Sequence, residues 1–176
     1  ASSYLVKFSR LIRMYLDYSQ QNEITLEEEL NALKLYLELE KVRFEDELEY
    51  TISVDNQLKT KQIKVPSLFI QPYVENALKH GLLHKLNNRK LHIEAKIIQQ
   101  NKLEITVEDN GIGRAQSEKL KRPNQQHKPF ATKANEERVH LYKNKLKRDI
   151  AITTNDLYDE NDVAAGTKVV ITMPIH

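Results

Sequence analysis

Cysteine is absent from the 176 residues of this chain. Its absence excludes disulfide scaffolds, zinc–thiolate sites and thiol nucleophiles from these residues. Long hydrophobic runs are missing too, since no apolar stretch approaches the roughly 18 to 20 residues that a membrane-spanning helix needs. The chain is long enough for one domain, or for one domain with an appendage, and its 40% hydrophobic residues can form a core.

A large net charge is lacking as well, because 27 basic residues nearly cancel 25 acidic ones. A strongly basic surface is therefore not the overall design, and we expect no nucleic-acid partner. The charges are unevenly placed: residues 1–50 hold six basic and eleven acidic side chains (net −5), and 114–148 hold eleven and three (net +8). Taken alone, the basic segment is an ordinary solvated helix and loop; alternatively, it faces an anion such as a polyphosphate.

Glycine is scarce. A typical globular chain has about 7% glycine, which would give about a dozen here, but this chain has four: Gly81, Gly111, Gly113 and Gly166. We expect each of them where the backbone needs unusual freedom or close approach.

Two amphipathic helices are predicted at the start of the chain, over residues 4–19 and from Thr25 to about Glu45. Thr25 and Glu28 fit a capping box, and three consecutive glutamates suit the positive end of the second helix. Its mostly apolar stripe consists of Leu26, Leu30, Leu33, Leu37 and Phe44.

The remaining residues alternate between strand and helix patterns. Alternation predicts strands at 50–54, 91–100, 103–107, 150–154 and 167–173, with a hairpin between the second and third. Helices are expected from Pro66 to about Leu83 and over 134–147, and the polar segment 114–132 is expected to form a long loop of the kind that serves as a lid. The sum predicts an α+β fold with a mixed, largely antiparallel sheet covered by helices on one face.

One group of polar residues is expected on a single face of the helix around 75–81. At about 100° per residue, Glu75, Asn76, Lys79 and His80 lie opposite the apolar face. Oxygen ligands of this kind suit magnesium bridged to phosphate, and a lysine can neutralise phosphate charge. The alternative is an ordinary solvated face, which on charge alone is the commoner case.

Two further motifs follow predicted strands or open them. Asp109 stands at a strand end, where its carboxylate can accept a hydrogen bond from an amino group, and Gly111 and Gly113 would let the backbone approach a flat ligand. Asp-Asn-Gly is also ordinary turn chemistry. Gly166-Thr167 opens the last strand, where a glycine needs no function.

In this order, the motifs resemble the ATP-binding domain of GHKL (Bergerat-fold) ATPases, and among them the LytS-like sensor histidine kinases. The resemblance rests on the Glu-Asn-x-x-Lys-His-Gly of 75–81, the Asp-Asn-Gly-Ile-Gly of 109–113, the polar lid and the Gly-Thr of 166–167. Residues 25–30, 36–44 and 65–77 are similar to the same class. The resemblance implies a Bergerat-type two-layer α/β sandwich preceded by two amphipathic helices. It divides the chain into a partial helical dimerisation region, 1–47, and an ATP-binding catalytic domain, 48–176, with a lid at about 114–133.

The resemblance also implies a role for each motif residue. Asn76 would coordinate the magnesium ion, and Glu75 would polarise the attacking group or support the metal shell. Lys79 and His80 would contact phosphate, and with Glu75 and Asn76, Lys79 would form the catalytic set. The adenine amino group would bind Asp109.

Other positions would shape the base pocket or the lid. Gly111 and Gly113 would form the pocket, and Thr167 would support Asp109 directly or through water. The chain departs from the family in the lid, whose second glycine-rich box is replaced by 127–135. Side chains such as Thr132 would then contact the phosphates in place of the backbone.

The second departure concerns the phosphoacceptor histidine. None of the six histidines has the Pro-His-Phe context of this class, and His127-Lys-Pro-Phe lies in the lid. The resemblance therefore implies a cytoplasmic catalytic fragment of a membrane-anchored bacterial two-component sensor. It would bind ATP and Mg²⁺, phosphorylate a histidine outside this chain, pair with a response regulator and form a homodimer in the full-length sensor.

Two alternatives remain open. A different enzyme of the same fold would hydrolyse ATP or phosphorylate serine. A degenerate, nucleotide-free domain would act only as a dimerisation or partner-binding module.

Overall fold

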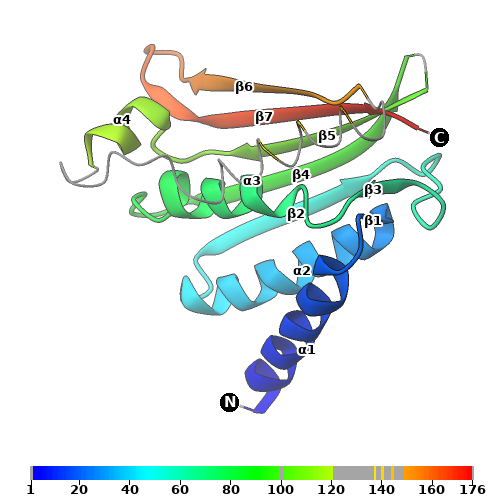
Figure 1. Ribbon diagram of the computed structural model, residues 1–176. Helices are drawn as coiled ribbons and strands as arrows, with labels where there is room; N and C mark the ends of the chain where they lie inside the picture. Colours follow the sequence, from blue (N-terminus) through cyan, green and yellow to red (C-terminus); the bar gives the residue numbers. More distant parts are fainter. Residues whose placement is uncertain are drawn as a thin grey trace.

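A five-stranded sheet forms the centre of the molecule. The computed structural model describes residues 2–99, 101–120, 137, 140, 144 and 149–175. The sheet has the strand order β2-β4-β5-β7-β6, with helices on one face (Figure 1). The strands are β2 (Leu48–Val54), β4 (Arg89–Ile98), β5 (Lys102–Asp109), β6 (Ala151–Tyr158) and β7 (Ala164–Pro174).

The sheet is mixed, as the sequence predicts. β2 and β4 run parallel, and the other three neighbouring pairs are antiparallel, including the predicted β4–β5 hairpin. In this register Asp109, at the end of β5, lies opposite Thr167 near the start of β7. Two motifs that are almost sixty positions apart in the sequence therefore meet at one end of the sheet.

Alternating side chains of the three central strands point to the covered face. Ile93, Ile105 and Ile171 are fully buried there, as the predicted alternation requires. Burying each such side chain stabilises the fold by about 1.5–3 kcal/mol. The expected α+β class, with helices on one face of a mixed sheet, is confirmed.

The two predicted N-terminal helices are present as α1 (Ser2–Ser19) and α2 (Leu26–Arg43). The predicted apolar stripe of α2 faces the sheet and belongs to its core. A second apolar pair on α2, Leu35 and Leu39, packs against Leu11 of α1. The chain thus buries α2 on two sides, because α1 crosses it on the side away from the sheet (Figure 1).

The capping box at the start of α2 is complete. The Glu28 backbone N–H donates to Thr25 Oγ1 (3.1 Å), and the Thr25 N–H donates to Glu28 Oε2 (2.7 Å). These bonds satisfy two backbone donors that a helix start otherwise leaves without a partner inside the helix.

Removing the cap is expected to destabilise the protein modestly. Thr25→Ala should lower the free energy of unfolding by about 1 kcal/mol, because the Glu28 N–H loses its acceptor. Urea denaturation followed by circular dichroism measures the change. Thr25→Ser keeps the hydroxyl and should retain most of the stability; a loss as large as that of Thr25→Ala would show that the hydroxyl is not the cause.

The helix expected from Pro66 begins later. Pro66 ends a short strand, β3 (Lys64–Pro66), that pairs with β1 (Glu23–Thr25), and α3 starts at Gln71 and ends at Asn76. Between them, the buried carboxylate of Glu29 accepts the backbone N–H groups of Leu68 and Ile70, both at 2.9 Å. This contact between α2 and the turn, which no local pattern announces, sets where α3 begins.

α3 continues directly into a π-helix, η1 (Ala77–Leu82). Its wider turn is shown by the hydrogen bond from Leu83 N to Leu78 O, 2.8 Å long and five residues apart. Single π-helical turns inside a helix are frequent at functional sites. Val74, Ala77, Leu78 and Gly81 are buried against the sheet, as expected.

Part of the chain lies outside the described residues. The predicted lid is described only over 114–120, where α4 (Arg114–Lys119) forms, and 121–133 lie outside. Of the helix expected over 134–147, Glu137, His140 and Asn144 are described, and they are helical. The division of the chain at residue 47 remains a prediction, and α2 shares one core with the sheet. None of the helices described is long and apolar enough to cross a bilayer.

Candidate functional site

A cavity of about 340 Å³ opens at the end of the sheet where β5 ends and β7 begins. Its size is within the range of small-molecule sites. The helices α3, η1 and α4 form its walls, and strands β5, β6 and β7 form its floor. The residues that line it are Tyr73, Asn76, Ala77, His80, Gly81, Val107, Asp109, Gly113, Arg114, Ser117, Glu118, Thr154, Thr167 and Val169.

Asp109 is the buried charge of this cavity, with 4% of its surface exposed. Its Oδ1 accepts the backbone N–H of Gly111 at 2.8 Å. Burial raises the pKa of Asp109 to about 6, and hydrogen bonds from the backbone N–H groups of Gly111 and Thr167 partly oppose this rise. The expected support of Asp109 by Thr167 is thus a main-chain contact.

The four glycines of the chain gather around Asp109. A Cβ on Gly81 would lie 2.5 Å from Asp109 Oδ1, and a Cβ on Gly166 would lie 1.9 Å from the Asp109 carbonyl oxygen. A Cβ on Gly111 would meet the backbone of Gly81 at 2.3 Å. Gly113, with φ +80°, lines the same cavity. The scarcity of glycine therefore has a structural explanation: in this chain glycine serves to build one site.

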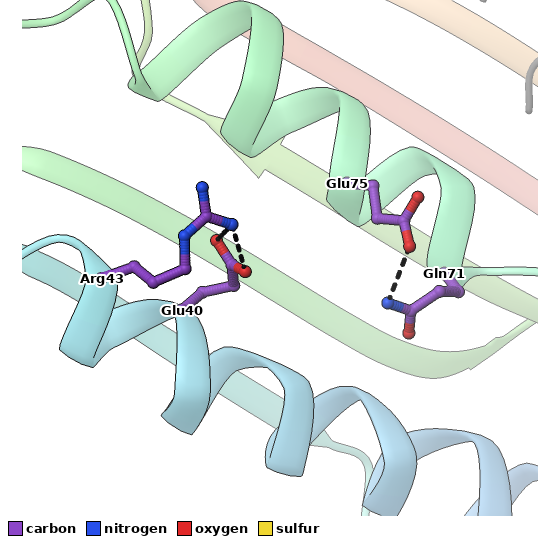
Figure 2. A network of polar contacts seen from close by, with 4 residues as sticks. All are labelled: Glu40, Arg43, Gln71 and Glu75. Carbon is purple, nitrogen blue, oxygen red and sulfur yellow. Dashed lines mark hydrogen bonds and ion pairs between the residues drawn. The ribbon is translucent and has the colours of Figure 1, made fainter. Parts of the chain in front are cut away.

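The polar face predicted on the helix divides in two. Asn76 and His80 line the cavity, whereas Glu75 and Lys79 do not. Glu75 Oε1 instead accepts from Gln71 Nε2 at 3.3 Å, on the side of α3 that faces α2, where Glu40 pairs with Arg43 (Figure 2). Residues four apart share a row on a helix, so Asn76 and His80 belong to one row and Glu75 and Lys79 to the neighbouring one.

A second set of contacts fixes the turn after Asp109. Asn110 Oδ1 accepts from Lys90 N and its Nδ2 donates to Asn88 O, both at 2.8 Å. Lys85 Nζ donates to Asn110 O at 2.7 Å, and its positive charge lowers the pKa of Asp109 slightly. Asn110 thus orients the turn through its side-chain amide, and Lys85 is a neighbour that the motifs did not reveal.

The donors present fit a magnesium–nucleotide complex. The Asp109 carboxylate lines a cavity of about 340 Å³, and Gly81 and Gly166 let the protein backbone pack directly against this residue. Magnesium keeps several waters and bridges phosphate oxygens, so one amide oxygen from Asn76 suffices as a protein ligand. No cluster of three or more His, Cys, Asp or Glu side chains suited to a metal occurs in the described part of the chain.

Comparison with known proteins agrees with the motif order. The family model described as "Histidine kinase" matches residues 1–48. The sensor protein LytS of Staphylococcus haemolyticus is 34% identical over 113 residues, which are 64% of this chain and 19% of that protein. YwpD of Bacillus subtilis is 35% identical over 108 residues, 61% of this chain and 38% of that protein.

This chain is similar in sequence to the LytS sensor histidine kinases. It spans about a fifth of the length of the LytS protein and about two fifths of YwpD. The histidine kinase domain of the blue-light activated kinase from Erythrobacter litoralis EL346 has the same fold. It aligns with a TM-score of 0.58 at 16% identity and covers 99% of this chain and 82% of that domain.

Several residues that line the cavity were missed by the motifs. Arg114 and Ser117 come one turn apart on α4, directly after the glycine motif, so their position was a usable signal. Thr154 comes from β6 and could be placed only from the strand register. Arg114 also forms a two-pronged ion pair with Asp156 of β6, at 2.7 and 2.8 Å. Thr132, the residue expected to contact phosphate from the lid, lies outside the described residues.

Proposed function

We propose that this chain is the ATP-binding catalytic part of a LytS-like sensor histidine kinase. The observation that supports this most is the cavity that Asp109, Asn76 and His80 line together, with Gly81 and Gly166 packed directly against Asp109. In the proposed reaction, the bond between the γ-phosphorus and the β–γ bridging oxygen breaks. A phosphorus–nitrogen bond to a histidine outside this chain forms, and ADP leaves.

The residue roles are proposed as the family resemblance implies. Asn76 binds magnesium, Asp109 accepts from the adenine amino group, and Gly111 and Gly113 shape the base pocket. His80 and Lys79 contact phosphate. Phosphoryl transfer depends mainly on positioning and charge neutralisation, so these parts suffice.

Lys79, Glu75 and Thr132 are proposed from the motifs rather than from the lining of the cavity. Lys79 and Glu75 do not line the cavity, and Glu75 faces α2. In their proposed catalytic roles, the side chains of Lys79 and Glu75 act from outside the cavity. The role of Thr132 is proposed from the lid sequence alone.

The partners are proposed in the same way. Histidine kinase ThkA, which shares this fold with a TM-score of 0.53 at 17% identity, has been solved in complex with the response regulator TrrA. We infer a response regulator partner here. A homodimer is supported by a stripe on α1 that lacks cover within the described residues: Leu5, Phe8, Ile12 and Leu16 are 62%, 45%, 42% and 61% exposed. The cytoplasmic side of a membrane-anchored sensor is the proposed location.

The proposed function predicts binding without self-phosphorylation. Calorimetric titration with a non-hydrolysable ATP analogue should give a binding isotherm that requires magnesium, and incubation with labelled ATP should leave no acid-labile phosphate on this chain. The Asn76→Ala variant is the control for the metal dependence. Absence of binding would favour a nucleotide-free module, steady phosphate release would favour an ATPase, and acid-labile label on the chain would contradict the absence of a phosphoacceptor.

A further inference from the structure

The last turn of η1 must be placed accurately for the cavity to exist. Gly81 lies so close to Asp109 that a single added carbon would overlap the carboxylate. The Gly81 carbonyl also accepts the Ile112 N–H at 3.2 Å. A small displacement of this turn would therefore open the space around Asp109 to water.

A π-helical turn is poorly suited to hold this position by itself. Such turns are rare and usually limited to a single turn, and η1 ends immediately after Gly81, at Leu82. The Leu82 carbonyl oxygen accepts the Lys85 N–H at 3.1 Å, from the residues that follow η1. It accepts a second bond, at 3.0 Å, from Arg89 Nε at the start of β4. This second bond connects the turn to the sheet.

Arg89 is itself held from two directions. Its Nη1 pairs with Glu47 Oε2 at 2.9 Å, and its guanidinium lies 5.2 Å from the centre of the Phe44 ring, at the end of α2. Only 14% of the Arg89 side chain is exposed. A guanidinium with several fixed partners loses little further freedom when it donates one more hydrogen bond.

We propose that Arg89 is a positioning residue that fixes the end of η1 and thereby keeps Gly81 packed against the Asp109 carboxylate. The contacts run without a gap from Phe44 and Glu47 through Arg89 to Leu82, next to Gly81. This inference deepens the proposed function, since it names a residue that sets the geometry of the same site. It also connects the end of α2 with the cavity.

The test titrates Asp109 in the folded protein without nucleotide. Carbon-13 NMR of aspartate carboxyl groups gives its pKa, and the Asp109→Asn spectrum assigns the signal. In Arg89→Met, which keeps the unbranched stem but has no donor, we expect the pKa to fall from about 6 toward its ordinary value, by about one pH unit or more as water enters. Loss of a positive charge would instead raise a carboxyl pKa, so a fall cannot come from charge removal.

Two variants serve as controls. Arg89→Gln retains an N–H donor at the same distance along the side chain and should keep the pKa of Asp109 near that of the wild type. Lys90→Met removes a positive charge one position along β4, at an exposed surface pair with Glu49, and should change nothing. An unchanged or raised pKa of Asp109 in folded Arg89→Met would overturn the proposal. Equal falls of this pKa in Arg89→Met and Arg89→Gln would overturn it too. If Arg89→Met does not fold, Arg89→Lys, whose ammonium pairs with Glu47 and has no Nε donor, must show the fall.

Nucleotide binding gives an independent readout. If the wild type binds the ATP analogue, Arg89→Met should bind it at least about tenfold more weakly, and Arg89→Gln should not. A wild type that binds no nucleotide would refute the proposed function, and the titration of Asp109 would still decide the role of Arg89.

Discussion

Asp109→Asn is expected to abolish nucleotide binding and, in the same protein, to raise stability at neutral pH. The Asp109 carboxylate would accept a hydrogen bond from the adenine amino group. The amide N–H of an asparagine at that position is itself a donor and would face the donor of the amino group. Loss of a hydrogen bond to a charged group, together with the unpaired donor, corresponds to a loss in affinity of at least about 100-fold. Calorimetry with the ATP analogue measures this loss, and unchanged affinity would refute the adenine role.

The stability effect follows from the raised pKa of Asp109. Because burial disfavours the charged form, this pKa is about 6 in the folded protein and near its ordinary value when unfolded. Below both values the group is protonated in both states and costs nothing. As pH rises between them, the unfolded state releases the proton first, so stability falls. Above pH 6 the loss is complete and amounts to about 3 kcal/mol.

The asparagine variant does not ionise and so avoids this loss. Its advantage in urea denaturation should therefore be largest near pH 7 to 8 and should shrink as the pH is lowered toward 4. Asp55→Asn is a matched control, because Asp55 Oδ1 also accepts a backbone N–H two residues ahead, from Gln57 at 2.9 Å, but in an exposed turn. It should change neither binding nor the pH dependence of stability. An advantage of Asp109→Asn that stays constant from pH 4 to 8 would contradict the burial of a charge.

Periodicity predicted the elements that bury one face. α1, α2 and the strands β4, β5 and β7 lie where the apolar spacing placed them, and the capping box located the start of α2 to the residue. Short elements carry no such signal: β1 and β3 have three residues each and are defined only by pairing with each other.

Long-range contacts account for the errors near α3. Pro66 reads as a helix start, but the proline of α3 is Pro72, and the buried Glu29 on α2 holds the intervening turn. Of the residues singled out by the motifs, the structure brings Asn76, His80 and Asp109 to one cavity. On a regular helical wheel Asn76 and His80, four residues apart, form one row, and Glu75 lies about 100° away from it. Which of these rows would line the cavity depends on how the helix packs against the sheet, which no local pattern gives.

Replacing the glycines by alanine should harm the protein in different ways at different positions. Gly166 has φ +133°, and its added carbon would meet the Asp109 main chain, which cannot rotate away. We expect Gly166→Ala to lower the free energy of unfolding by more than about 4 kcal/mol, enough to leave much of the protein unfolded. Gly113→Ala, with φ +80° and Ala164 Cβ at 3.0 Å, should cost less, about 1–2 kcal/mol.

Gly81→Ala should separate folding from binding. Its backbone is helical, where alanine is favoured over glycine by about 1 kcal/mol, and its added carbon would meet the Asp109 side chain rather than the backbone. The carboxylate can turn aside, so the variant should fold but bind the ATP analogue at least about 100-fold more weakly, as when the hydrogen bond is lost. Urea denaturation and calorimetry on the three variants test the series. A folded Gly81→Ala variant with wild-type affinity would show that nucleotide binding does not depend on the present position of the Asp109 carboxylate. The added methyl group and the carboxylate in that position cannot occupy the same space.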